Sequence, residues 1–207
     1  MLALAAMLPT AAPAAPSLAG TYQIHQMEMA GGLELRADGH FRYAFDYGAV
    51  SETAEGDWTA TPTGVVLTSN PMPKAPSFAL VADDPAPKGE LWMTLEDPGF
   101  EWGTPLKAIA ITAADAGQGV EISADDRGRV DLAGQPAFAE VAPLMPVYGA
   151  TGEMFPLSPE RGHRLRFRFH ANDLGRVAFN RQPLRADGAN LLLERFDTAI
   201  RFLPDRP

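Results

Sequence analysis

The segment from His163 to His170 offers the clearest set of side chains that could bind a charged ligand. Its sequence, HRLRFRFH, alternates basic and apolar residues, and on a strand such residues face opposite sides. One face then carries four basic side chains, those of Arg164, Arg166, Arg168 and His170. Guanidinium groups on alternate strand positions lie about 6.6 Å apart and can bind carboxylate, sulfate or phosphate groups. The pattern predicts an anion-binding surface, a surface that docks an acidic part of the same chain, or a solvated face paired with acids such as Glu194.

Aromatic residues form a second candidate site, because they recur at every second position between residues 41 and 47. The residues concerned are Phe41, Tyr43, Phe45 and Tyr47. Side chains at this spacing share one face of a strand. The rings, with Tyr43 and Phe45 at the centre, are expected either to line a barrel that holds an apolar ligand or to pack as ordinary core together with Trp58.

Catalytic and metal-binding motifs are absent from the sequence, so we predict no catalytic residue, cofactor or metal. Cysteine is absent, which excludes disulfides, thiolate metal sites and a cysteine nucleophile. The four histidines lack ligand spacing, and His163 and His170 would face opposite sides of their strand. Neighbouring carboxylates such as Asp83 and Asp84 could serve a saccharide hydrolase only if the fold brought another acid close to them.

The elements that must position these residues are strands. Gly and Pro, 19 of each, are spread along the chain, as expected for many short strands joined by tight turns. The segment Leu33–Trp58 predicts a β-hairpin followed by a third strand, and four further strands are expected from residue 163 onward as an antiparallel meander. The sequence predicts an all-β protein with two antiparallel β-sandwich or small-barrel lobes.

Charge divides the chain near residue 105. Residues 20–104 contain 13 acidic and 4 basic residues, whereas residues 105–207 contain 13 of each. This asymmetry predicts an acidic β domain over residues 20–104 and a sandwich-like domain with a C-terminal meander over residues 105–207. An acidic surface repels nucleic acid and anionic lipid, so we expect neither as a partner.

The first 19 residues are uncharged and rich in Ala and Leu, with an apolar run too short to span a membrane. Ala12-Pro13-Ala14 supplies the small residues that a signal peptidase requires. We therefore predict export to the periplasm or medium of a bacterium, an origin to which the excess of Arg over Lys also points. A disordered Ala/Pro tail on a cytoplasmic protein is the alternative.

Two short patterns resemble known families. The Gly20-Thr21-Tyr22 opening and Gly56-Asp57-Trp58 resemble small exported lipocalin-like barrels over residues 20–69, which implies a carrier of a small apolar molecule. The turn and strand Asp125–Leu132, preceded by LKAIAIT at residues 106–112, resembles transthyretin-like and carboxypeptidase-regulatory-like sandwich modules. That resemblance implies an accessory or binding role. A calcium loop is the other interpretation of the turn.

These observations predict a non-catalytic, exported binding or interaction module whose partner is a protein or a small molecule. A lipocalin-like carrier and a carboxylate-dependent hydrolase acting on a saccharide are the alternatives. A closed barrel with an empty apolar interior would favour the carrier, and an open cleft with two facing carboxylates would favour the hydrolase.

Overall fold

The structure, a computed structural model, describes residues 18–96, 105–112 and 115–205. The predicted export segment, residues 1–19, lies almost entirely outside these ranges. Within them the regular elements are strands, together with one short 3-10 helix, η1 (Pro146–Tyr148). The predicted all-β class is therefore confirmed.

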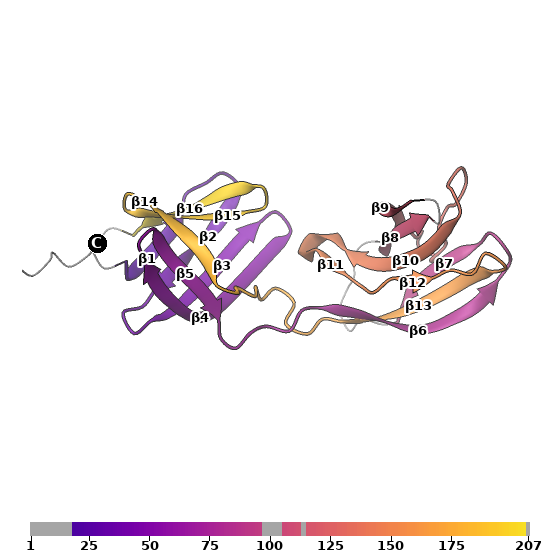
Figure 1. Cartoon of the computed structure of the whole chain (residues 1–207), viewed down its shortest axis with the longest axis horizontal. Helices are drawn as coiled ribbons and strands as arrows, with labels where there is room; N and C mark the ends of the chain where they lie inside the picture. Colours follow the sequence, from indigo (N-terminus) through magenta and orange to yellow (C-terminus); the bar gives the residue numbers. More distant parts are fainter. Residues whose placement is uncertain (1–17, 97–104, 113–114, 206–207) are drawn as a thin grey trace, which may run out of the picture.

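Eight strands close into a barrel at one end of the molecule (Figure 1). Five come from the first third of the chain: β1 (Gly20–Ile24), β2 (Met29–Leu35), β3 (His40–Tyr47), β4 (Val50–Thr61) and β5 (Gly64–Ser69). Three come from its end: β14 (Gln182–Asp187), β15 (Asn190–Arg195) and β16 (Thr198–Pro204). The order around the barrel is β1-β16-β15-β14-β5-β4-β3-β2. The first and last strands of the chain thus pair with each other, with Tyr22 opposite Pro204.

The barrel interior is packed with the apolar residues that alternate along these strands. Phe41, Tyr43 and Phe45 are each at most 3% exposed, whereas Tyr47, at the end of β3, is 37% exposed. The Tyr43 ring contacts Phe45, Phe179 and Phe202, with ring centroids 5.1–6.3 Å apart. The predicted hairpin and third strand are confirmed as β2, β3 and β4. In this part of the barrel, side chains from opposite walls touch one another.

Two further sheets lie at the other end of the molecule (Figure 1). One has three strands, β6 (Ser77–Ala86), β13 (Gly162–His170) and β7 (Leu91–Leu95). The central strand β13 is antiparallel to β6 and parallel to β7. The other sheet contains β8 (Lys107–Thr112), β9 (Asp115–Ser123), β10 (Phe138–Met145), β11 (Ala150–Thr151) and β12 (Phe155–Pro156).

These two sheets share one hydrophobic core. Leu165, Phe167 and Phe169 contribute to it from β13, and Ala108 and Val141 from the other sheet. The strict alternation predicted for residues 163–170 is therefore confirmed, because the apolar face of β13 is buried and its arginines are exposed.

The charge asymmetry predicted a boundary near residue 105, but the sheets do not divide the chain there. The chain leaves the barrel after β5, builds both other sheets, and returns to the barrel at β14. The two connecting segments run side by side, since the Asp173 N–H donates to the Lys74 carbonyl at 3.1 Å. Net charge is a property of exposed side chains, whereas buried apolar faces determine which strands pair.

The C-terminal meander contains three strands, β14, β15 and β16, and excludes β13. Residues 176–180, predicted as a strand of that meander, form a connector that is bound to the barrel. The Thr53 N–H donates to the Gly175 carbonyl, and the Val177 N–H donates back to Thr53, both at 2.8 Å. Ser69 holds the following residues, because its hydroxyl bonds to Val177 and Phe179. The connector thereby extends the barrel wall beside β4.

Candidate ligand-binding groove on the barrel wall

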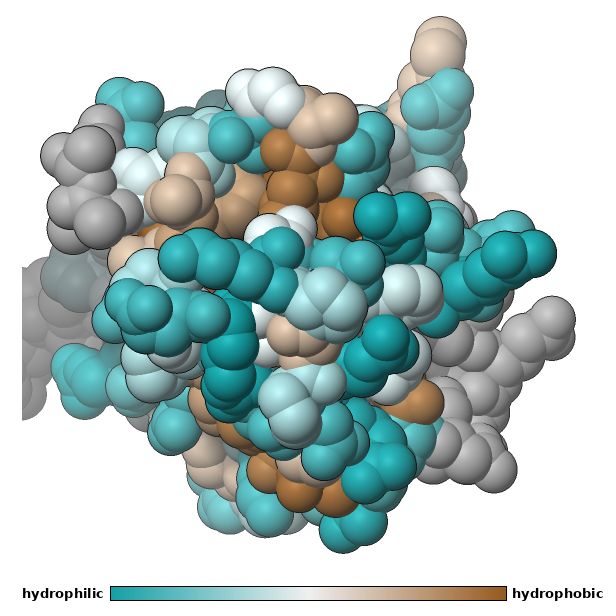
Figure 2. Space-filling model, turned by 90° about the vertical axis from the view of Figure 1, so that its right-hand side faces the viewer, coloured by the Kyte–Doolittle hydropathy of each residue, from teal (hydrophilic) through white to brown (hydrophobic). Residues whose placement is uncertain are grey.

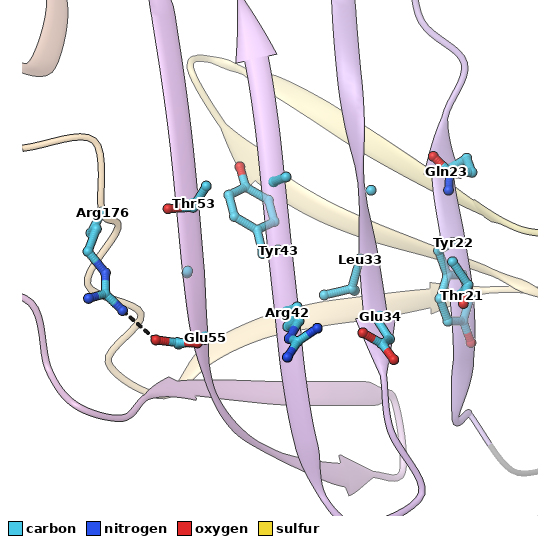
Figure 3. Close-up of a pocket in the computed structure, with 13 residues that line it drawn as sticks. Thr21, Tyr22, Gln23, Leu33, Glu34, Arg42, Tyr43, Thr53, Glu55 and Arg176 are labelled. Carbon is cyan, nitrogen blue, oxygen red and sulfur yellow. Dashed lines mark hydrogen bonds and ion pairs between the residues drawn. The ribbon is translucent and has the colours of Figure 1, made fainter.

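A groove of about 560 Å³ crosses the outer wall of the barrel over β1, β2, β3 and β4, and Arg176 closes one end (Figure 3). Most of its side chains are outward-facing, those of Thr21, Gln23, Glu34, Arg42, Ala44, Thr53 and Glu55. Tyr22, Leu33, Tyr43 and Ala54 also line it, although their side chains are buried inside the barrel. Since β14, β15 and β16 contribute no lining residue, the groove lies outside the barrel and not in its lumen.

Strand register arranges the outward-facing residues in two rows across the wall. In the first row, Gln23 lies opposite Gly32, Gly32 opposite Ala44, and Ala44 opposite Thr53. Gly32 and Ala44 are small, so this row forms the hollow. A Cβ atom on Gly32 would come within 2.7 Å of the Tyr22 carbonyl oxygen, which leaves no space for a larger residue there.

The second row carries alternating charges along one side of the groove. Glu34 lies opposite Arg42, and Arg42 lies opposite Glu55. The row ends at Arg176, whose Nη2 donates to Glu55 Oε1 at 2.6 Å (Figure 3). Two carboxylates and two guanidiniums thus face the groove, and their formal charges cancel.

The predicted arginine strand, His163–His170, has partners on β7 and just after its end. Arg168 Nε donates to Glu96 Oε2 at 2.8 Å, and Arg166 Nε lies 3.7 Å from the other oxygen of the same carboxylate. Arg164 stacks on the Trp92 ring, with its Cζ 4.6 Å from the ring centroid. The exposed His170 lies opposite Ser77 in register. The predicted acid pairing is present, but with Glu96 instead of Glu194.

Tyr43 and Phe45, the other predicted site residues, point into the barrel beside a buried ion pair. Glu52 on β4 lies opposite Phe45 in register, and its Oε1 accepts a hydrogen bond from Arg195 Nη2 at 2.7 Å. Burial raises the pKa of Glu52, an effect that the Arg195 charge only partly offsets. Burial also raises the pKa of Tyr43 well above its usual range. Sequence inspection missed Glu52 and Arg195 because they lie 143 residues apart in the chain.

Sequence inspection also missed that the buried His163 is a partner of Asp83. The Nδ1 atom of His163 lies 2.9 Å from Asp83 Oδ1, and its Nε2 accepts a hydrogen bond from the Ser158 N–H. Burial would raise the pKa of Asp83, but hydrogen bonds from Arg161 and His163 outweigh burial and lower it. Both ring nitrogens of His163 are therefore engaged in holding β6, β13 and the preceding loop together.

His163 borders a second hollow, of about 370 Å³, that lies between Lys88 and Phe138. The start of β13 and the end of β6 lie at the right-hand end of Figure 1, the end that faces the viewer in Figure 2. Figure 2 shows hydrophilic residues over most of this face, with the hydrophobic ones in smaller, separate areas. The described surface here offers no broad apolar docking site.

The side chain of Asp125 stabilises its own turn by accepting hydrogen bonds from the backbone. Asp125 Oδ1 accepts hydrogen bonds from the N–H groups of Arg127 and Arg129, at 2.9 and 2.8 Å. The bond from Arg129 is the main reason that the pKa of Asp125 is lowered. Among the described residues, no group of three or more His, Asp or Glu side chains is placed to hold a metal ion. The same residues include no helix long and apolar enough to cross a membrane.

No protein-family model, curated protein or solved structure matches this chain. The lipocalin-like and transthyretin-like resemblances therefore stay predictions, and the function has to be argued from the sites themselves.

Proposed function

We propose that this protein is an exported, non-catalytic binding module, and that a short peptide with no net charge lies across the outer groove of its barrel. The groove is the observation that carries this proposal. Its row of small residues gives an extended chain access to the wall, and its charged row supplies both hydrogen-bond donors and acceptors. The balanced charges of Glu34, Arg42, Glu55 and Arg176 favour a ligand whose own charges balance.

The dimensions of the groove support an occupant of about four residues. From Glu34 to Arg176 the charged row crosses three inter-strand spacings, or about 14 Å at the usual strand separation. An extended tetrapeptide has about the same length. Its α-ammonium group would then lie near Glu34 and its carboxylate near Arg176, each beside a group of opposite charge.

A saccharide is a weaker candidate for the same groove. Sugar-binding sites commonly offer an exposed aromatic face, because amphipathic rings contact one face of a sugar while remaining partly wet. The aromatic residues that line this groove, Tyr22 and Tyr43, are only 5% and 3% exposed, and their rings belong to the barrel core.

The two alternative functions receive less support from the contacts. A carrier needs enclosed apolar space, whereas the described rings around Tyr43 pack against one another. A hydrolase needs one carboxyl group that holds a proton. Glu34 and Glu55 both face the groove, but Arg42 lies between them, and Glu55 is already paired with Arg176.

The proposal extends to the organisation and location of the protein. We assign the barrel to one lobe and the two sheets around the second core to another, sandwich-like lobe inserted between β5 and β14. The export proposal rests on residues 1–19. Cell fractionation of the tagged full chain tests it, because an exported protein is recovered from the periplasm or the medium.

Titration of the ¹⁵N-labelled protein with tetraglycine and with cellotetraose tests the binding proposal. We expect tetraglycine to cause saturable shifts of the Ala44 and Thr53 amides, and cellotetraose to cause none. Thr53→Trp should fill the groove and weaken tetraglycine binding at least tenfold. Thr59→Trp is the matched control, since Thr59 is also exposed on β4 but lies outside the groove. Binding of cellotetraose at the same amides would refute the peptide class, and no shift with either probe would refute the groove as the site.

A further inference from the structure

An ion pair crosses the lumen at one end of the barrel. Glu52 is on β4 and Arg195 is on β15, two strands that are separated by β5 and β14 in the barrel order. Their side chains nevertheless meet at 2.7 Å, with Glu52 only 8% exposed. Tyr43, on β3, lies close enough for both charges to act on its hydroxyl group. Three strands thus direct polar groups into the same end of an otherwise apolar interior.

Each of these three side chains has a buried polar atom without a hydrogen-bond partner among the described residues. The atoms are the Tyr43 hydroxyl, Glu52 Oε2 and Arg195 Nη1. Buried polar groups are nearly always satisfied, and an unpaired one destabilises the fold by more than a typical hydrogen bond contributes. Three such atoms at one place would be satisfied by a hydrogen-bonding group from outside the chain, either water or a ligand.

The ring of Phe196 covers this end of the barrel. It stacks on Phe45 with centroids 5.6 Å apart and planes 13° apart, and it also contacts Tyr47. Arg195 lies 4.7 Å above the same ring. Phe196 has a φ of 53°, a left-handed conformation that is uncommon for a bulky residue. A residue of this kind persists where its side chain makes contacts that hold it, as the Phe45 stack does here.

The chemistry of the three atoms defines the ligand. Arg195 Nη1 can only donate a hydrogen bond, Glu52 Oε2 in its ionised form can only accept one, and the Tyr43 hydroxyl can do either. A group that both donates and accepts satisfies all three atoms. A carboxylate would be repelled by Glu52 and an ammonium group by Arg195, whereas a neutral hydroxyl or amide meets neither penalty.

We propose that this end of the barrel is a second binding site, in which Tyr43, Glu52 and Arg195 hold the hydroxyl or amide group of a small uncharged molecule and Phe196 covers it. An aromatic body on that molecule would take the place that the Phe196 ring now holds on Phe45, so the exposed Phe196 has to move outward before it covers the ligand. This site is separate from the outer groove, because the side chains that form it point to the opposite face of the wall.

Four probes of the same shape test this proposal on the intact protein: benzyl alcohol, benzamide, benzoate and benzylammonium. Titrations followed by NMR should give saturable shifts of the Phe45 and Phe196 amides with the first two probes. The two charged probes should bind at least tenfold more weakly. Equal shifts with all four would mean that the charge pair does not select the ligand, and no shift with any of them would mean that the polar atoms bind water alone. Either result overturns the proposal.

Two conservative variants keep the test independent of folding, which is checked by the dispersion of the amide spectrum. Tyr43→Phe removes only the hydroxyl and should weaken benzyl alcohol binding at least tenfold. Glu52→Gln leaves the Arg195 charge unbalanced, so benzoate should gain at least tenfold in affinity. Glu194→Gln is the matched control, because Glu194 is exposed on the same strand as Arg195 and lies outside the site. A folded Glu52→Gln protein that still rejects benzoate would refute the assigned role of the ion pair.

Discussion

The barrel is expected to fold without the segment inserted between β5 and β14. The Asp173 N–H donates to the Lys74 carbonyl at 3.1 Å, which is the hydrogen bond that closes a two-residue β-turn. Replacing residues 75–172 with Asn-Gly therefore joins the two connectors without moving them. When it begins at residue 20, the product has about 90 residues, a size at which many domains fold alone. It keeps all 16 buried residues of the barrel core.

The size of the effect follows from that core. A two-state domain of about 90 residues unfolds with an enthalpy of about 60 kcal/mol near 60 °C. The fragment 20–104, which the charge boundary would define as a domain, lacks six of the 16 core residues, namely Phe179, Leu184, Leu191, Leu193, Ile200 and Phe202. Losing the burial of six such side chains removes about 9–18 kcal/mol, which is comparable to the whole stability of a typical domain, about 5–15 kcal/mol. This fragment also exposes the edges of β1 and β5.

Calorimetry and proton NMR of the two purified chains test the reasoning. The excised barrel should give one cooperative transition and dispersed amide signals, and the fragment 20–104 should give neither. Leu174 packs against the second core, so Leu174→Ser is included in the excised chain to keep it soluble. A folded 20–104 fragment beside an unfolded excised barrel would show that the chain divides near residue 105 and that the barrel is not an independent unit.

Three further substitutions test individual contacts. Asp83→Asn should destabilise the protein by about 1–3 kcal/mol at pH 7, since it removes the charged partner of a buried histidine. The pKa of Asp83 is lower in the folded protein than in the unfolded chain, so its contribution to stability is present above about pH 4 and is lost as the pH falls through the folded-state pKa. Urea unfolding should therefore show that the free energies of unfolding of the two proteins differ less at pH 3 than at pH 7. Gly56→Ala should destabilise the barrel by more than about 2 kcal/mol, because the φ of Gly56 is +156° and a Cβ atom there would lie 2.1 Å from a carbonyl oxygen. Gly39 has a φ of +86° and open space around it, so Gly39→Ala should change the stability by about 1 kcal/mol. Equal thermal shifts for the two variants would refute the steric argument. Glu96→Gln should change the stability by less than about 1 kcal/mol. It should also raise the salt concentration at which the protein elutes from heparin, because Arg166 and Arg168 lose their carboxylate partner. Unchanged elution would mean that other groups pair with these guanidiniums.

Local patterns predicted the elements that depend on neighbouring residues. The period-two run from Phe41 to Phe45 identified a buried strand face. The turn at Asp38-Gly39 identified the hairpin that joins this strand to the one before it. The alternation of residues 163–170 correctly separated a buried face from an exposed one. In each case side-chain polarity and spacing within about ten residues contain the necessary information.

Long-range pairings were beyond the same reasoning. Nothing near Tyr22 indicates that its strand pairs with residues near Pro204, and the departure of the chain from the barrel between β5 and β14 leaves no local mark. The same limit applies to the sites. Glu52 pairs with Arg195, and Asp83 with His163, across 143 and 80 residues. Single-sequence patterns record which face a residue occupies but not which distant residue shares it, so the candidate groups were visible and their partners were not.

The geometry of β4 allows the two binding proposals to be judged separately. Glu52 and Thr53 are adjacent in the chain, yet one is buried in the lumen and the other is exposed in the outer groove. Because successive strand residues point to opposite faces, a substitution at either position leaves the other surface in place. Thr53→Trp should therefore weaken tetraglycine binding at least tenfold while benzyl alcohol still binds. Glu52→Gln should change the choice between benzyl alcohol and benzoate while tetraglycine still binds. If either folded variant lost the binding of both tetraglycine and benzyl alcohol, the barrel would have a single binding site. The substitution on the other face would then act on that site indirectly.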